Sequence, residues 1–287
     1  MSHEKKVIVV TGASSGIGNS VATLMAKRGN LVYGTCREPA SHQKSADEFF
    51  EMLRMDVRDD YSVTAAIAEV MEREKRIDVL ICCAGYGISG SIEETAIDEA
   101  RSLLETNYFG TIRSLRAVLP VFRAAHAGRI LVISSIAGRI GLPFQSFYSS
   151  SKFALEAMVE ALRLEVREFG IDAALIEPGG YRTGFFGARS IAEISRASGK
   201  DSPYYLNHAA VLRRTDSEPK GDPLEVAKLV ERLLRVKRLA VRYSVGPLAQ
   251  RIGAWLKPFM PSRCYEYILG LAYSIDSESH EENQDSG

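Results

Sequence analysis

The chain has 287 residues, and its 36 Lys and Arg balance 36 Asp and Glu. A balanced charge argues against a nucleic-acid-binding surface, which needs a basic stripe. The four cysteines show neither metal-ligand spacing nor a C-x-x-C motif, which predicts a reducing compartment and no structural metal. The polar N-terminus shows no signal-peptide pattern, and no apolar run reaches the ~18 residues of a membrane span, so we expect a cytoplasmic protein.

Strand and helix patterns alternate along most of the chain, which predicts one large α/β domain over 1–245. The expected strands lie near 6–11, 31–36, 52–56, 77–83, 129–134, 171–177 and 239–243. The expected helices lie near 16–29, 60–75, 98–125, 148–169 and 223–236. Right-handed crossovers then give a doubly wound (Rossmann) parallel sheet of seven strands with helices on both faces. Ligands of such sheets bind outside the carboxyl ends of the strands.

The first strand leads into the sequence Thr11-Gly12-Ala13-Ser14-Ser15-Gly16-Ile17-Gly18, after which apolar residues recur at helical spacing. Glycines in a strand-to-helix turn allow tight turning and close approach of the backbone to a ligand. The helix N-terminus offers unpaired N–H groups and a positive dipole end to a phosphate. A Gly-rich surface turn is the simpler alternative, but strand, turn and helix in this order favour dinucleotide binding.

The second strand ends at Cys36 and Arg37, where an NAD-binding chain would carry an acid for the ribose 2′-hydroxyl. A guanidinium instead suits a 2′-phosphate by charge and by fork geometry, and Ser14 and Ser15 could add hydroxyl donors. The expected cofactor is therefore NADP(H). An ordinary surface arginine at position 37 would leave the choice open, and the neighbouring Glu38 weakens the argument slightly.

Tyr148 and Lys152 lie four residues apart in a predicted helix, so their side chains share one face. A cation beside a phenol favours the phenolate and lowers the tyrosine pKa from its usual ~10. Such a tyrosine can exchange a proton with an alcohol or a carbonyl oxygen. Most pairs at this spacing merely share a helix face, and it is the glycine turn that favours the chemical interpretation.

Together, T-G-x-x-x-G-x-G and Y-x-x-x-K resemble the short-chain dehydrogenase/reductase family in its compact single-domain branch. Further matches follow in the family's order over residues 5–245: Asp56-Val57, Cys82-Cys83-Ala84-Gly85, Asn107, Ser135, and Pro178-Gly179 with Thr183. One departure is that Cys82 and Cys83 replace two asparagines of the family pattern, which puts a hydrogen-bonding detail in doubt. Adjacent strand residues point to opposite faces, so we expect two packed thiols.

The resemblance implies hydride transfer between a nicotinamide and a carbonyl or alcohol carbon. Tyr148 would be the acid/base, Lys152 would lower its pKa and bind the ribose, Ser135 would donate to the reacting oxygen, and Asn107 would hold a relay water. The simpler alternatives are a strand-end cap for Ser135 and a buried helix asparagine for Asn107. The implied cofactor contacts are Gly12, Ser14, Ser15, Gly16, Ile17, Gly18, Arg37, Asp56, Val57, Ala84, Gly85, Tyr148, Lys152, Pro178, Gly179, Tyr181 and Thr183.

The competing class is an NADP(H)-binding sensor or scaffold of the same fold without turnover. Members of that kind usually lose Tyr or Lys from the motif, so the intact Ser135, Tyr148 and Lys152 favour an enzyme. The resemblance also implies a homodimer or homotetramer.

We expect three segments at the rim to form the substrate pocket, and the last of them is the connection 184–221. Connections as long as this one are usually functional or mobile. The expected substrate contacts are Tyr86, Ser135, Leu142, Phe144, Tyr148 and Phe185. Their apolar and aromatic character suggests a lipophilic alcohol or ketone of steroid, retinoid or fatty type, although apolar lining is common to small-molecule pockets.

Residues 246–275 form an expected helical extension, which Pro258 and Pro261 split into two short helices. Packing over the core or a subunit contact is the favoured role. The alternative is an amphipathic patch that lies on a membrane surface and collects lipophilic substrate. Residues 276–287 are acidic and polar without Lys or Arg, which predicts a disordered tail.

Overall fold

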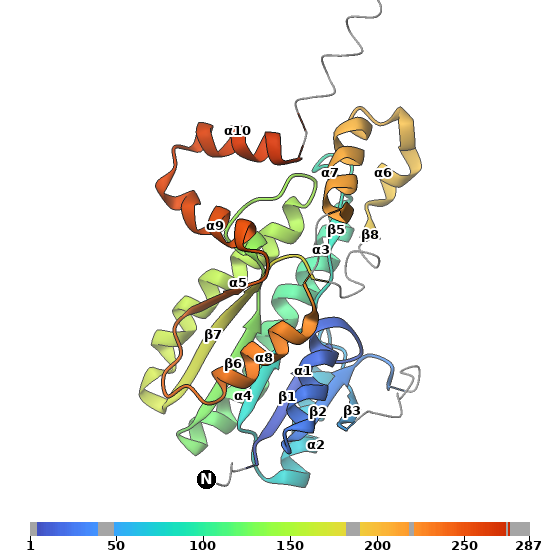
Figure 1. Ribbon diagram of the computed structural model, residues 1–287. Helices are drawn as coiled ribbons and strands as arrows, with labels where there is room; N and C mark the ends of the chain where they lie inside the picture. The colour runs from blue at the N-terminus through green and yellow to red at the C-terminus, as the bar shows by residue number, and fades with distance from the viewer. Residues whose placement is uncertain (1–4, 40–48, 182–189, 218–220, 274, 276–287) are drawn as a thin grey trace, which may run out of the picture.

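The computed structural model describes residues 5–39, 49–181, 190–217, 221–273 and 275, and its centre is a parallel sheet of seven strands (Figure 1). The strands are β1 (Val7–Thr11), β2 (Leu31–Cys36), β3 (Glu51–Arg54), β4 (Val79–Cys82), β6 (Gly128–Ile133), β7 (Ile171–Pro178) and β9 (Arg242–Val245). Their order across the sheet is β3-β2-β1-β4-β6-β7-β9. The direction of the crossovers therefore reverses between β1 and β4, where open sheets of this kind bind their ligands. The predicted doubly wound fold is confirmed.

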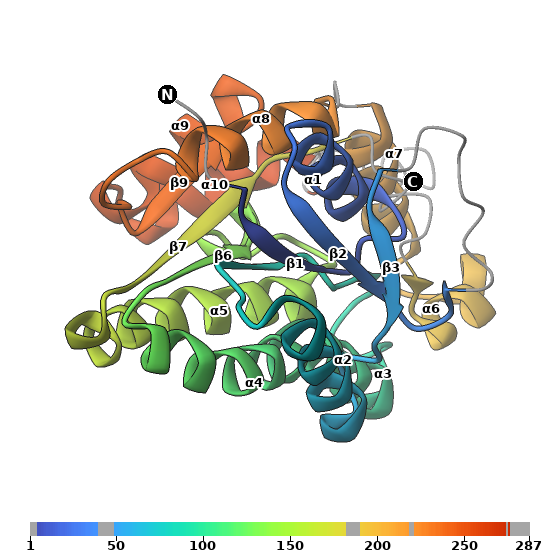
Figure 2. The same ribbon diagram turned by 90° about the horizontal axis from the view of Figure 1, so that it is seen from below.

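Helices cover both faces of the sheet (Figure 2). One face carries α1 (Gly16–Lys27) and α8 (Pro223–Leu233), and the other carries α2 (Asp60–Glu74), α4 (Gly110–Ala125) and α5 (Ser146–Glu165). Alternate residues of β1 enter the two cores: Val7 and Val9 pack toward α2, α4 and α5, whereas Ile8 and Val10 pack toward α1 and α8. A strand buried on both faces must be apolar throughout, which explains its continuous β-branched run.

The predicted helix over 98–125 is interrupted. α3 (Ile97–Leu104) passes into a π-helical turn (Glu105–Phe109) before α4 begins. Asn107 lies in this turn and is fully buried. Isolated π-helical turns often occur at functional sites, because the extra residue redirects a side chain or a carbonyl.

The last strand also lies later than the predicted 239–243. Leu239 is buried among the residues under α8, and its backbone N–H donates to Asp172 at 2.7 Å, so it belongs to the connection into β9.

Several short elements have no counterpart in the sequence prediction. A two-stranded sheet pairs β5 (Ile88–Ser89) with β8 (Ser190–Ile191), and each strand is too short to show a period. Within the long connection lie α6 (Glu193–Ser198) and α7 (Tyr205–Ser217), above the carboxyl ends of the strands (Figure 1). Short 3₁₀ helices lie at Ile136–Gly138, Arg167–Phe169, Gly199–Asp201 and Lys257–Phe259.

The C-terminal residues form α9 (Leu248–Leu256) and α10 (Ser262–Tyr273), separated near the two prolines as expected. None of the helices in the described part of the chain combines the length and the apolar character that spanning a bilayer requires.

Candidate active site

A cavity of about 760 Å³ opens at the carboxyl ends of β1, β4, β6 and β7. Its lining includes every predicted cofactor contact that falls within the described residues. Thr183, the remaining one, lies outside the described residues, as does Phe185 on the substrate side. The sheet therefore brings together at one rim motifs that are distant in the sequence.

The glycine turn packs backbone against backbone on the end of β4. Gly12 has a φ of +66°, and a Cβ there would lie 2.7 Å from the Cα of Ala84. A Cβ on Gly18 would lie 2.3 Å from the carbonyl oxygen of Gly12, so neither position accepts a side chain. Ser15 is the N-cap of α1, which directs the first-turn N–H groups of that helix toward the cavity.

Thr11 resolves the hydrogen-bonding detail that the cysteine substitutions put in doubt. Its Oγ1 accepts from the backbone N–H groups of Cys83 and Ala84, both at 3.1 Å. Cys82 is buried in the core beneath α4, and Cys83 packs toward the core beneath α1, so the two thiols lie on opposite faces of the sheet as predicted. Burial raises the pKa of Cys82 to about 12 and that of Cys83 further still, which makes both thiols poor nucleophiles.

One end of the cavity is cationic. Exposed Arg37 follows β2, and Arg58 comes from the turn before α2. Arg58 binds Asp56 with Nη2–Oδ2 at 2.7 Å, and this hydrogen bond holds the pKa of the Asp56 carboxyl below its ordinary value. Sequence analysis missed Arg58, although its position two residues after Asp56 in a predicted strand-end loop was a usable signal.

Asn107 uses its side chain to fix the loop after β4. Its Oδ1 accepts from the Tyr86 N–H at 2.9 Å, and its Nδ2 donates to the Tyr86 carbonyl at 2.9 Å and to Ser151 Oγ at 3.1 Å. A Cβ on Gly85 would lie 3.0 Å from the same Oδ1 and 3.9 Å from Lys152 Nζ. Asn107 therefore connects the loop after β4, at Tyr86, directly to Ser151 of α5. Its proposed part in a water relay stays a prediction.

Ser135 and Tyr148 meet at the end of β6. The Ser135 Oγ accepts from the Ala137 N–H at 3.1 Å, so this serine does cap the short helix after it. It also hydrogen-bonds Tyr148. Burial raises the pKa of Tyr148 to about 12, and the Ser135 hydrogen bond acts in the opposite direction.

Lys152 is buried one turn after Tyr148. Its Nζ donates to the Ile133 carbonyl at 2.9 Å and lies 5.7 Å from the centre of the Tyr148 ring. Burial lowers the pKa of Lys152 to about 8, while Cys83 and Glu156 favour the ammonium. The expectation that Lys152 brings the tyrosine pKa below its usual value is wrong for this structure, because desolvation of the phenol is the larger effect.

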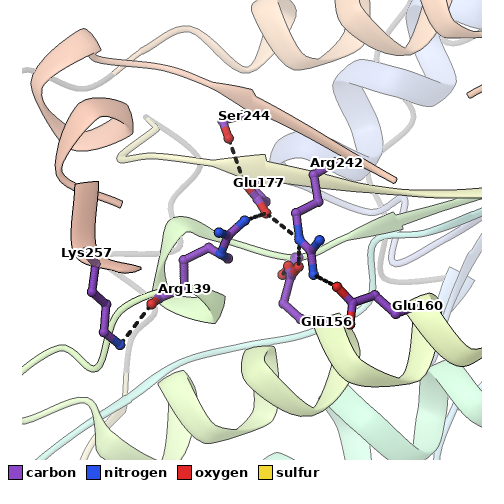
Figure 3. A network of polar contacts seen from close by, with 8 residues as sticks. Arg139, Glu156, Glu160, Glu177, Arg242, Ser244 and Lys257 are labelled. Carbon is purple, nitrogen blue, oxygen red and sulfur yellow. Dashed lines mark hydrogen bonds and ion pairs between the residues drawn. The ribbon is translucent and has the colours of Figure 1, made fainter. Parts of the chain in front are cut away.

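Behind Lys152, a polar network joins α5 to β7 and β9 (Figure 3). Glu156, one turn beyond Lys152, accepts from Ser134 Oγ at 2.5 Å, and Ser134 lines the cavity. The guanidinium of Arg242 binds Glu156 at 2.7 Å and Glu177 at 3.4 Å, and it also contacts Glu160. Both central carboxylates are almost inaccessible, at 5% exposure for Glu156 and 2% for Glu177.

The network extends to the segment that carries Ser135 and to the C-terminal helices. Glu177 accepts from Ser244 Oγ at 2.5 Å and from Arg139 Nη1 at 3.5 Å. The backbone carbonyl of Arg139 in turn accepts from Lys257 Nζ at 3.0 Å (Figure 3). Because Arg139 follows directly on the turn after Ser135, these contacts fix the position of that turn.

The substrate side agrees only in part with the prediction. Tyr86, Leu142, Ser135 and Tyr148 line the cavity, but Phe144 is not among its lining residues. Phe144 has a φ of +57° and stacks on His208 of α7 with ring centres 4.9 Å apart, so it anchors α7 instead of the substrate.

Thr215 of α7 lines the cavity from the connection 184–221, which the sequence placed at the pocket. Two further lining residues, Gln250 of α9 and Tyr273 of α10, come from elements that the sequence did not place there. The Gln250 Oε1 accepts from the Gly180 N–H at 3.0 Å. Because α9 and α10 are far apart in sequence from the predicted motifs, only their packing shows that they reach the cavity.

The sheet order and this cavity place the chain among the oxidoreductases built on a doubly wound sheet. Residues 6–193 match the family described as short chain dehydrogenase, and the chain belongs to that family.

Similar proteins match most of the chain. A 3-ketodihydrosphingosine reductase from Bacteroides thetaiotaomicron is 36% identical over 274 residues, which cover 95% of this chain and 99% of that protein. The mouse (Mus musculus) 17-beta-hydroxysteroid dehydrogenase type 1 is 37% identical over 253 residues, which cover 83% of this chain and 72% of that protein. A short-chain dehydrogenase from Streptomyces avermitilis has a similar structure, with a TM-score of 0.79, 32% identity, and coverage of 96% of this chain and 100% of that chain.

Proposed function

We propose that the protein is an NADP(H)-dependent oxidoreductase that interconverts a ketone or aldehyde and an alcohol. The observation that carries the proposal is the convergence of the glycine turn, Ser135, Tyr148 and Lys152 on one cavity. Gly12 and Gly18 leave the backbone of the turn uncovered by side chains. This fits a dinucleotide, because its pyrophosphate needs close contact with the backbone and a helix N-terminus.

The bound nicotinamide supplies or accepts the hydride, and the chain's own residues handle the proton. Tyr148 donates its phenolic proton to the carbonyl oxygen in reduction and takes it back in oxidation. Ser135 donates a hydrogen bond to the same oxygen and so fixes its position. Lys152 places a positive charge near the reacting groups and binds the nicotinamide ribose. A phenol whose pKa lies at about 12 is protonated at neutral pH, which suits the reductive direction.

The relatives support a lipophilic substrate. One is named for 3-ketodihydrosphingosine and one for a 17-beta-hydroxysteroid. In this chain, Ile88, Leu103 and Ala137 pack around Tyr148, and Tyr86 and Leu142, which pack against this cluster, line the cavity. We infer an aliphatic or polycyclic ketone or alcohol. The cytoplasmic location and the homo-oligomeric state remain expectations.

The direct test is to follow NADPH absorbance while the protein is offered a panel of long-chain ketones, steroid ketones and small polar aldehydes. We expect turnover of one or more apolar ketones and little turnover of the polar aldehydes. Binding of NADPH without turnover of any carbonyl or alcohol would support the sensor class instead.

The cofactor preference is tested at Arg37. The change Arg37→Ala should weaken NADPH binding about 10- to 100-fold and NADH binding much less, because a charge-assisted hydrogen bond is worth ~1.5–3 kcal/mol. Arg54→Ala is the matched control, since Arg54 is an exposed arginine on β3 that does not line the cavity. Both affinities are measured by titration of the protein with each cofactor. An equal loss for NADPH and NADH would refute the phosphate contact.

The pH profile tests the role of Lys152 and its neighbour. Since burial brings the Lys152 pKa to about 8, carbonyl reduction should decline as pH rises through about 8 and the ammonium is lost. Glu156 favours the charged lysine, so Glu156→Gln should move this decline to lower pH. Glu160→Gln, one turn further along α5 and exposed, should leave the profile unchanged. A wild-type profile without a decline near pH 8 would count against Lys152 as the titrating group, and a decline that Glu156→Gln leaves in place would show that Glu156 does not tune it.

A further inference from the structure

The helix α9 carries its apolar residues on the side that faces away from the protein. Leu248, Ile252, Trp255 and Phe259, the last just beyond the helix, follow at helical spacing and are 65%, 45%, 64% and 73% exposed. The residue that α9 buries is the small Ala254, which packs on the segment after β6. A helix that serves only to cover a core places its apolar stripe inward. We call these four exposed residues the α9 stripe.

The helix α10 adds to this surface. Tyr267, Ile268 and Leu271 are 64%, 50% and 57% exposed, and α10, which is described along its whole length, has no buried residue. Packing over the core of the same chain, one of the two roles favoured from the sequence beside a subunit contact, therefore does not explain these exposed apolar side chains. Clusters of exposed apolar side chains on neighbouring elements of this kind mark an interaction surface.

We propose that the α9 stripe and the exposed face of α10 dock on the surface of a lipid bilayer. Exposed Arg251 lies within the span of the stripe and exposed Arg263 lies near the start of α10, while Glu266 is the one acid in residues 246–273. The whole chain is neutral, so this excess of cations is local. An apolar helix face with a cationic fringe and with Trp and Tyr among its residues is typical of helices that lie in the membrane interface.

A second copy of the chain is the competing occupant. It would bring the same cationic fringe against itself, whereas lipid headgroups with negative charge neutralise it. We therefore assign the surface to a membrane.

The two docking helices also contribute residues to the proposed active-site cavity. Gln250 of α9 and Tyr273 of α10 line the cavity. Both helices lie beyond the carboxyl ends of the strands (Figure 1). Docking would place the entrance of the cavity at the bilayer, from which an apolar ketone could enter without crossing water. This last step rests on the proposed function, whereas the docking itself does not.

Trp255 is the one tryptophan of the chain and belongs to the α9 stripe, so it reports directly on the surface. Full-length protein is titrated with vesicles of phosphatidylcholine alone and of phosphatidylcholine mixed with phosphatidylglycerol. We expect the Trp255 emission to move to shorter wavelength, to be quenched by lipids with brominated acyl chains, and to change at lower lipid concentration when phosphatidylglycerol is present.

Stripe variants keep the reporter and test the contact. Ile252→Glu and Phe259→Glu should each weaken vesicle binding about tenfold or more, because each removes a large apolar side chain from the buried surface. Leu164→Glu is the matched control, since Leu164 on α5 is 75% exposed and far along that helix from Tyr148. All three should retain the wild-type turnover of a short apolar ketone supplied in solution without lipid.

Two results would overturn the proposal. One is an emission spectrum that neither vesicle changes. The other is a shift that follows protein concentration without lipid and disappears in the stripe variants, which would assign the surface to a second copy. Vesicle binding by a protein that turns over no carbonyl or alcohol would count against the proposed function alone.

Discussion

Replacing Tyr148 with phenylalanine should lower kcat for carbonyl reduction by about 10²–10⁴-fold and leave NADPH binding almost unchanged. General acid–base assistance contributes ~10²–10⁴-fold, and the change removes only the proton donor. The aromatic ring, which is 8% exposed, keeps its place among Leu103, Ala137 and Ile88, so the cavity wall is retained. Steady-state kinetics and an NADPH titration measure the two quantities separately.

Tyr181→Phe is the matched control for this experiment. Tyr181 lines the same cavity and is 2% exposed, and its hydroxyl donates to Glu225 of α8 at 3.2 Å. Removal of that hydroxyl should change kcat little. Normal turnover by the Tyr148→Phe protein would reject the proposed acid/base, and an equal loss in both variants would indicate a general disturbance of the cavity.

Arg242→Leu should lower the free energy of unfolding by about 3 kcal/mol at neutral pH. Breaking a buried ion pair by removal of one partner costs ~3–5 kcal/mol, and Glu177 retains Ser244 and Arg139 as partners, which favours the lower end. The loss arises because Glu156 and Glu177 would face each other in a low-dielectric site without the guanidinium between them (Figure 3). Urea unfolding measures it.

The same variant should show a specific pH dependence. Burial already raises the pKa of Glu156 above its ordinary 4.5, and Arg242 acts against that rise. Without Arg242 the folded-state pKa of Glu156 is higher still, so the folded protein binds the proton more tightly than the unfolded chain. Stability is then regained as pH falls from the folded-state pKa toward 4.5, and the difference from wild type narrows.

Arg235→Leu provides the comparison at the surface. Arg235 pairs with Glu231 one helical turn away at 2.7 Å, but the arginine side chain is 56% exposed. Its loss should cost less than about 0.5 kcal/mol at any pH, because exposed pairs contribute little. An equal loss of unfolding free energy in the two variants would show that the buried Arg242 network stabilises the fold no more than an exposed ion pair does.

The sequence by itself determined the fold and the nucleotide end of the site. The β-branched runs, the glycine turn and the helical periods are local signals, and each of them is set by residues close together in the chain. Right-handed crossovers make the strands parallel, so Gly12, Gly85, Ser135 and Pro178, which follow or end strands, lie at one rim of the sheet.

Tertiary structure decided what depends on residues that are distant in the chain. The network of Glu156, Glu177 and Arg242 joins three separate elements, although the spacing of Lys152, Glu156 and Glu160 on α5 was a signal for its first part. Phe144 looked like a substrate contact from its position, but its left-handed backbone turns the ring onto His208. Gln250 and Tyr273 reach the cavity only because the C-terminal helices fold back over it.

The pKa values of Tyr148 and Lys152 likewise depend on tertiary structure, although the sequence identifies the two residues. Spacing placed Lys152 beside Tyr148, and a cation at that position would be expected to lower the phenol pKa. Burial is a property of the packed molecule and not of the local sequence, and it raises the pKa of Tyr148 and lowers that of Lys152. The residues of the candidate site could thus be named from the sequence, whereas their charge states were decided by the desolvation that only the folded chain imposes.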